Sequence, residues 1–450
     1  MNEHVDFERL VAGHIAEEGA TPPSDAFYVE LFSRAGGSGQ RPEWLALIKE
    51  PPMRTNNHLA VGSPTVRVMA ILVATMLLAL ALAVAGAGAQ QLLASNGPIV
   101  VAADGSGDFA TIGEAVAAAD DGDLVKVRPG TYVEAVVIDG DISLEGDGER
   151  EDVIIRAPDD GPEWDTKFPF IGDKPYAVVL AGSDASVSGL TLSGEDSRLF
   201  LDGGTATVTD MLFDEVGTPP ASAGTAIARA IVVTGGADAD IVDNEFVGGN
   251  GINVFEYSVA RIEGNHFVVG GIYGDYGDGT TIRDNIFSEA APMAIRFGEP
   301  ADVLVEGHRI EDREVAINTI NGLGPAVIRG NDIRGAEMTA ISADSSTGQV
   351  IDNVIADSNL GISWSGDGGL VAGNTINGGA TGIIVGAGTS TVRDNSVKGA
   401  TNRGMSVYPS AVTGLSGNTL CGNAINLDVR DEAEVMDDGT NEVCEDAPAE

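Results

Sequence analysis

The phrase IVDNEF at residues 241–246 decides the fold of this chain, because variants of it recur along the second half of the sequence. Its last copy is LSGNTL at residues 415–420, and seven further copies lie between the two. Successive pivot residues of the phrase are 20 to 23 residues apart. The nine pivots are Asn244, Asn265, Asn285, His308, Asn331, Asn353, Asn374, Asn395 and Asn418. A fixed period of about 22 residues is typical of a solenoid in which each repeat forms one turn.

Each repeat also contains a second phrase, a small residue followed by an apolar one, as in GINV at residues 251–254 and GIIV at 382–385. The runs alternate with period two and show no helical pattern, so we expect short strands that bury their apolar faces only when stacked. Asparagine tolerates the bend between two strands and can bond to the same amide one turn away. This internal ladder resembles the right-handed parallel β-helix of the pectate-lyase-like family, and the resemblance covers residues 99–430. It implies an all-β coil in which the pivots, including His308, are structural.

The start of this coil, residues 99–148, is similar to the start of pectin methylesterases and their relatives, including the phrase GTYVE at residues 130–134. Thr111 and Glu114 have the spacing of a capping box, and an apolar stripe follows them. We therefore predict a helix over residues 111–120 that lies across the open end of the coil and covers its strand edges.

The segment before the coil contains an apolar stretch, Val68–Ala89, of 22 residues without a charge. That length suits one transmembrane helix, and the positive-inside rule places residues 1–67 in the cytoplasm and the coil outside. The alternative is signal-peptide cleavage after the Ala87–Ala89 motif and secretion. We expect residues 1–67 to be largely flexible, 90–98 to be a linker and 431–450 to form a C-terminal cap and acidic tail.

Composition limits the class of partner. The net charge is −43, which excludes nucleic-acid binding and suits a salty or calcium-containing exterior. The two cysteines, Cys421 and Cys444, are predicted to form a disulfide on the oxidising side of the membrane. We expect a monomer.

Catalytic motifs of the relatives are missing from the sequence. The signature phrases of pectin methylesterases, polygalacturonases and mannuronan epimerases are absent, and His266 reads as a turn residue rather than a base. A lyase or epimerase of another subtype stays open as an alternative, because it needs only a base and a group or Ca²⁺ that neutralises the uronate. Its candidate catalytic residues are Tyr273 and Arg296.

In pectate-lyase-like coils the substrate groove follows the strand that corresponds here to the second phrase. Aromatic faces, an arginine and carboxylates gathered on one strip suit a sugar. The ligand-binding candidates are Asn253, Glu256, Tyr257, Tyr273, Asp275, Tyr276, Arg296, Glu299, Asn318 and Trp364, together with Trp164 in the aromatic excursion at residues 157–178. Three hypotheses follow: a membrane-anchored protein that binds polysaccharide, a lyase or epimerase that uses Ca²⁺, and a structural or interaction solenoid.

Overall fold

The computed structural model describes residues 97–446, apart from 166–173, 183, 217–228, 249–250, 276, 278, 299–301, 323–324 and 346. The predictions for residues 1–67, for the Val68–Ala89 span and for most of the linker lie outside the described residues. No helix in the described part of the chain is long and apolar enough to cross a membrane.

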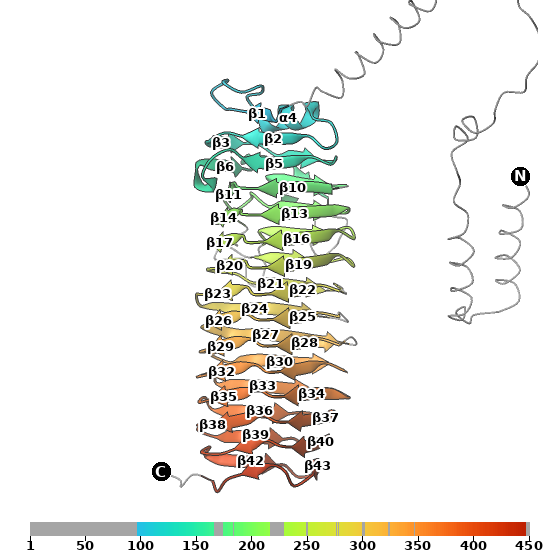
Figure 1. Ribbon diagram of the computed structural model, residues 1–450, viewed down its shortest axis with the longest axis vertical. Coiled ribbons are helices and arrows are strands. Elements are labelled where there is room, and N and C mark those ends of the chain that lie inside the picture. Colours follow the sequence, from blue (N-terminus) through green and yellow to red (C-terminus); the bar gives the residue numbers. More distant parts are fainter. Residues whose placement is uncertain are drawn as a thin grey trace, which may run out of the picture. The chain divides into compact units, whose positions relative to one another are not determined.

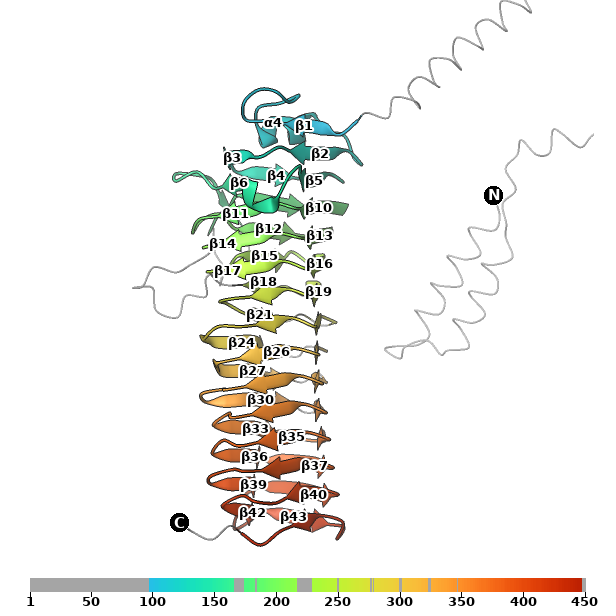
Figure 2. The same ribbon diagram turned by 60° about the vertical axis from the view of Figure 1, so that its left-hand side comes forward.

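The chain winds around one axis as a parallel β-helix, and each turn adds one strand to each of three long parallel sheets, A, B and C (Figures 1 and 2). We call one such turn a rung. Among the described residues, sheets A, B and C have 15, 14 and 13 strands. Their first and last strands are β1 (Ile99–Val101) and β43 (Glu434–Asp437) in sheet A, β3 (Gly130–Val133) and β44 (Glu442–Val443) in sheet B, and β4 (Val136–Ile138) and β42 (Ile425–Val429) in sheet C.

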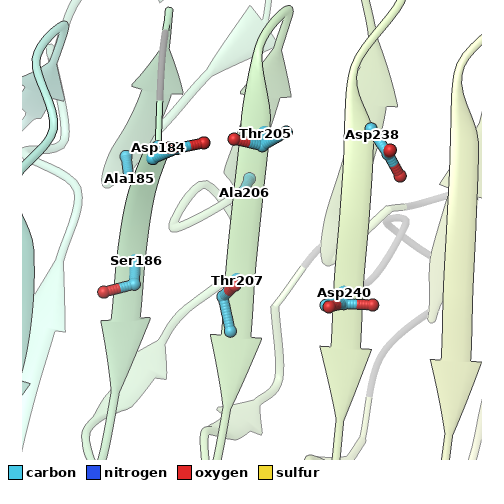
Figure 3. Close-up of a pocket in the computed structure, with 8 residues that line it drawn as sticks. All are labelled: Asp184, Ala185, Ser186, Thr205, Ala206, Thr207, Asp238 and Asp240. Carbon is cyan, nitrogen blue, oxygen red and sulfur yellow. The ribbon is translucent and has the colours of Figure 1, made fainter.

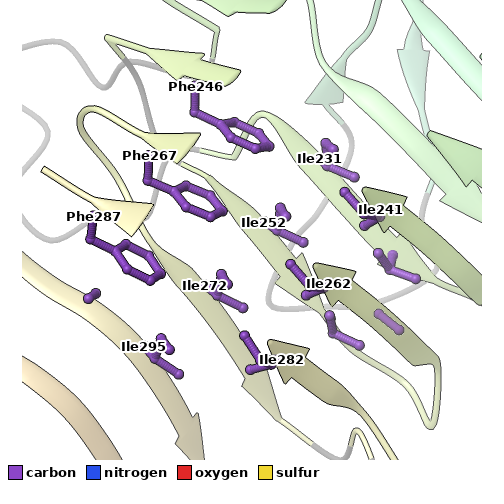
Figure 4. Packing of buried hydrophobic residues seen from close by; sticks show 14 of the residues in the cluster. Ile231, Ile241, Phe246, Ile252, Ile262, Phe267, Ile272, Ile282, Phe287 and Ile295 are labelled. Atoms are coloured by element: carbon purple, nitrogen blue, oxygen red, sulfur yellow. The ribbon is translucent and has the colours of Figure 1, made fainter. Parts of the chain in front are cut away.

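The strands pair in a register that stacks equivalent side chains above one another. In sheet A, β16 (Asp238–Val242) pairs with β19 (Val259–Glu263) so that Ile241 lies beside Ile262, and the isoleucine column continues with Ile282. Figure 4 shows these columns and the phenylalanine column that faces them. Four rings in sheet B, Phe213, Phe246, Phe267 and Phe287, stack with centroids 4.5 to 4.8 Å apart. The core is therefore a set of continuous apolar stacks, which explains why no single repeat needs to be stable alone.

The predicted pivots form one buried ladder at the bend between sheets A and B. In its regular steps, the backbone N–H and the side-chain amide of one asparagine both donate to Oδ1 of the next; from Asn244 to Asn265 both distances are 2.9 Å. The residue before each pivot is aspartate or glycine with a positive φ, from 52° at Asp284 to 74° at Gly307. The ladder continues one rung beyond the predicted set, because Asn418 donates to Asn441 at 2.9 and 2.8 Å.

His308 replaces asparagine within the ladder and keeps part of its bonding. Its Nδ1 accepts from the Asn285 N–H at 3.0 Å, so its Nε2 must carry the proton that is donated to the Ile282 carbonyl at 3.1 Å. Burial lowers the pKa of His308 to about 4, because the charged form loses its hydration. The ring is thus neutral at physiological pH and acts as a structural spacer.

The N-terminal end of the coil is covered by helix α4 (Ile112–Ala118), as the capping-box pattern predicts. Thr111 accepts from the Glu114 N–H, and Ile112, Ala115 and Val116 are buried. Glu134 adds a second cap, because its carboxylate accepts from the N–H groups of Ile112 and Gly113 at 3.1 and 2.9 Å. The GTYVE phrase therefore ends in a side chain that binds the free donors of the helix start.

The coil extends beyond residue 430, where the sequence analysis placed its end. Strands β43 and β44 pair in parallel with the preceding rung. The sequence does indicate this further rung, since Asn441 follows Asn418 by one period of the repeat. The acidic composition of residues 431–450 instead suggested a tail. Cys421 and Cys444 are joined by a disulfide with a Cα–Cα distance of 5.0 Å, which links the last two rungs of sheet B.

Candidate functional site

The outer face of sheet C carries a row of polar side chains, one from each successive rung. The row begins in β18 (Ile252–Val254) and passes through β21 (Ile272–Asp275), β24 (Ala291–Gly298) and β27 (Arg313–Gly322). Strand pairing places its members side by side, in the order Asn253, Tyr273, Arg296, Asn318, Ser342 and Ser363. With about 4.8 Å between rungs, the row is about 24 Å long. The alternation of the second phrase therefore predicts which of these side chains face outward.

Tyr273 is the aromatic member of this row and is partly buried. Its hydroxyl lies 3.5 Å from the Met293 carbonyl, to which it donates. Burial raises the pKa of Tyr273, and the positive charges of Arg313 and Arg296 oppose that rise only in part. The phenol is therefore protonated at neutral pH and serves as a hydrogen-bond donor.

Asn253, the first residue of the row, is fully buried although it projects from the outer face. Neither its Oδ1 nor its Nδ2 has a hydrogen-bond partner within the described part of the chain. An unpaired buried amide costs about 1–3 kcal/mol, so Asn253 destabilises the coil. Because it has no exposed surface, the prediction that it binds a ligand was wrong.

Arg313, which the sequence analysis missed, lies in the same rungs and is fully buried. Its Nη1 donates to the Gly270 carbonyl at 2.9 Å, and its guanidinium carbon lies 5.6 Å from the centre of the Phe287 ring. Nε and Nη2 have no partner among the residues described. Burial lowers the pKa of Arg313 to about 10, so the side chain still carries its charge at neutral pH. No motif marks this arginine, since only the stacking of three rungs brings it to Gly270.

Three other candidates lie at the ends of these strands. Glu256 has its carboxylate engaged, since Oε2 accepts from the Thr234 hydroxyl at 2.6 Å and from the Gly235 N–H at 3.0 Å. Tyr257 is 75% exposed at the following turn, and Asp275 is partly buried at the end of β21. Glu256 is therefore part of the turn scaffold rather than an available ligand group. Tyr276 and Glu299 lie outside the described residues.

The two tryptophan candidates do not lie on the open row. Trp364 in β33 (Leu360–Ser365) is buried inside the coil, so the prediction that it binds a ligand was wrong. The alternation places Ile362 and Trp364 inward and Ser363 outward, and Gly369 provides the room for the indole ring. Trp164 is partly buried on the outside, where its Nε1 donates to Asp202 at 2.8 Å.

A second apolar cluster covers the outer face of sheet C on the N-terminal side of the row. The excursion forms a hairpin, β7 (Glu163–Trp164) with β8 (Lys174–Pro175), and Trp164 meets Tyr176 edge to face at 6.0 Å. The buried members of the cluster are Tyr176, Val179, Phe200, Val232 and Phe255. The aromatic excursion is thus a cover for the first rungs, and the exposed part of the polar row begins beyond this cover, at Tyr273.

Sheet A carries a hollow of about 280 Å³ on its outer face, which the sequence did not reveal (Figure 3). It is lined by β10 (Asp184–Ser188), β13 (Thr205–Thr209) and β16, and its polar side chains are Asp184, Ser186, Thr205, Thr207, Asp238 and Asp240. Arg261 already neutralises Asp240 through a contact of 2.7 Å. The remaining acidic groups make this hollow less suited to an anionic sugar than the row on sheet C.

The lyase or epimerase alternative would use acidic groups to hold Ca²⁺. Within the described residues, one group of three metal-ligating side chains lies close together, namely Cys421, Glu442 and Cys444. The two sulfurs are bonded to each other, which leaves a single carboxylate there.

Comparison with known proteins identifies the class of the coil. Residues 294–434 match the family model described as a right handed beta helix region, so the chain contains a right-handed β-helix. No curated protein matches the sequence. Among solved structures, the alginate lyase AlyF-OU02 with G6 has a TM-score of 0.50 at 14% identity, over 77% of this chain and 88% of that chain.

Two further solved structures are similar at comparable identity. The periplasmic alginate epimerase AlgG has a TM-score of 0.45 at 12% identity, over 72% of this chain and 83% of that chain. A mannuronic acid specific polysaccharide family 6 lyase from human gut microbiota has a TM-score of 0.43 at 13% identity, over 69% and 78%. At such identities the likeness concerns the fold alone.

Proposed function

We propose that this chain is a carbohydrate-binding β-helix that holds a polysaccharide along the outer face of sheet C. The observation that carries the proposal is the row from Tyr273 to Ser363, whose five side chains are all partly exposed. An extended chain of sugars presents hydroxyl groups at a regular spacing, and a row of amides and hydroxyls at consecutive rungs can bond to them. Tyr273 adds an aromatic surface and Arg296 a positive charge.

Binding without turnover fits the electrostatics of this row better than lyase or epimerase chemistry. A lyase base must be deprotonated near the working pH, whereas burial raises the pKa of Tyr273. Arg313 keeps its proton with a pKa of about 10 and has no opening to solvent. Tyr273 therefore suits recognition and Arg313 a structural role, and the lyase alternative becomes an outcome of the experiment below.

We also propose that Val68–Ala89 anchors the protein with its coil outside the cell. The charge-free length of this segment supports an anchor. The disulfide between Cys421 and Cys444 supports an oxidising compartment for the coil. Carbonate extraction of membranes, followed by protease treatment of intact cells, tests both parts of this proposal.

The binding proposal is tested with the full chain on an array of neutral and uronate polysaccharides. We expect Tyr273→Ala and Arg296→Ala each to weaken binding by roughly tenfold or more, since each removes a stacking or charged contact near the middle of the row. Arg283→Ala is the control for loss of positive charge, because Arg283 is an exposed arginine on sheet A, paired with Glu306 at 3.4 Å.

Each outcome separates the three hypotheses. Equal loss in Arg283→Ala would show that affinity follows overall charge rather than the row. Release of unsaturated sugar, seen as absorbance near 235 nm and lost in Arg296→Ala, would show that the protein is a lyase and would contradict binding without turnover. If the protein bound none of the polysaccharides, the remaining hypothesis would be a structural or interaction solenoid.

A further inference from the structure

Three polar side chains from successive rungs meet on the outer face of sheet B. Glu245 begins β17 (Glu245–Val247), His266 begins β20 (His266–Phe267), and Ser288 follows β23 (Ile286–Phe287). Glu245 pairs with His266 in the strand register, and the neighbouring phenylalanines point into the core. The sequence analysis took His266 as a turn residue, yet it lies on a strand between a carboxylate and a hydroxyl.

The distances order these groups as nucleophile, base and orienting acid. His266 Nε2 lies 2.9 Å from the Ser288 hydroxyl oxygen. On its other side, His266 Nδ1 lies 3.8 Å from Glu245 Oε1. A proton on Nδ1 faces the carboxylate in this arrangement, which leaves Nε2 to accept the hydroxyl proton of Ser288.

Arg150 holds the carboxylate of this group in place. Its guanidinium, from the 3-10 turn η2 (Arg150–Asp152), bonds to the second carboxylate oxygen, Glu245 Oε2. The same guanidinium reaches Asp210 at 3.6 Å and is only partly exposed. Glu245 is thereby oriented toward His266 by a residue nearly a hundred positions earlier in the chain.

We propose that Ser288 is an activated nucleophile that accepts acyl groups from esters, with His266 as its base and Glu245 as the orienting acid. Ser288 Oγ bonds to the acyl carbon as its proton passes to His266 Nε2. The ester C–O bond then breaks, and the alcohol leaves with that proton. Water hydrolyses the acyl-serine through the same base and restores the hydroxyl. This activity is separate from polysaccharide binding on sheet C.

The backbone around Ser288 sets the expected speed of this reaction. The N–H groups of Ser288 and Glu289 already donate to the carbonyls of Phe267 and Val268, both at 3.1 Å. They cannot also stabilise the oxyanion, and such donors contribute roughly 100-fold or more each. We therefore expect a slow reaction that is best seen as covalent modification of the serine.

The experiment treats the full chain with a fluorophosphonate probe and maps the modified residue by mass spectrometry. We expect modification of Ser288, with its rate reduced roughly 100-fold in His266→Gln, which removes the base. Glu245→Gln should reduce the rate by a smaller factor. Ser396→Ala is the matched control, because Ser396 is a partly buried serine in sheet B at β38 (Ser396–Lys398), and it should leave the labelling unchanged.

The decisive comparison is the pH profile of labelling in folded protein, verified by circular dichroism for each variant. Activation by His266 predicts a rate that rises as the imidazole loses its proton and a flat, low rate in His266→Gln. No labelling of Ser288, or equal labelling with and without His266, would overturn the proposal.

Discussion

Two kinds of buried asparagine occur in this coil, and they differ in whether their amides are paired. Asn353, in the ladder, is fully buried, and its side chain takes part in five hydrogen bonds with Asn331, Asn374 and two carbonyls. Asn253, on the outer face of sheet C, is equally buried and has no partner in the described chain. The comparison teaches that hydrogen-bond pairing, rather than burial or residue type, separates asparagines that stabilise the coil from one that costs it stability.

The largest expected effect comes from breaking the ladder at its centre with Asn353→Ala. The substitution leaves the Asn331 N–H and the Ile328 carbonyl without their partners inside the coil. Each unpaired buried group costs about 1–3 kcal/mol, so we expect the free energy of unfolding to fall by roughly 3–5 kcal/mol. Urea denaturation followed by circular dichroism measures this loss.

A matched substitution in the next rung tests whether the loss belongs to the ladder. Thr375→Ala changes a partly buried residue on the outer face of β35 (Thr375–Asn377), and we expect a change within about 0.5 kcal/mol. If Asn353→Ala costs no more than Thr375→Ala, the ladder is not a main source of stability.

The second prediction concerns pH and the histidine within the ladder. His308 has a folded pKa of about 4, whereas an unfolded histidine has a pKa of about 6.5. Between these values the unfolded chain binds a proton and the folded chain does not, so stability falls as pH drops from 6.5 to 4. The difference between the two pKa values corresponds to about 3 kcal/mol.

His308→Asn removes this titration and restores the ladder residue. We expect the variant to lose less stability than the parent between pH 6.5 and pH 4, measured as the shift of the urea midpoint. Carboxylate titration contributes to both proteins and cancels in the comparison. If the stability of the parent and of His308→Asn depended on pH in the same way, protonation of His308 would not destabilise the fold. That result would contradict the effect expected from its burial.

These cases also show what the sequence could and could not predict. The ladder was predictable because a repeated residue at a fixed period must stack on itself, and the register of sheet C followed from the same repeat. Trp364 was assigned to the wrong side because a tryptophan near polar residues was read as a surface residue, although its neighbours alternate inward and outward. Arg313 and the group around His266 depend on contacts between rungs, and no spacing within one repeat reveals which side chains meet there.

The smallest effect, and the opposite sign, is expected for Asn253→Val. Valine already occupies this column one rung earlier, at Val232, so the replacement fits the outer face of sheet C. Removing an unpaired buried amide should raise the free energy of unfolding by about 1 kcal/mol, whereas any ladder asparagine should lose stability on the same change. Polysaccharide binding measured on the same preparation should stay unchanged, because the buried amide does not reach the surface. A stability loss of about 1 kcal/mol or more would contradict this prediction and place Asn253 with the stabilising asparagines of the ladder.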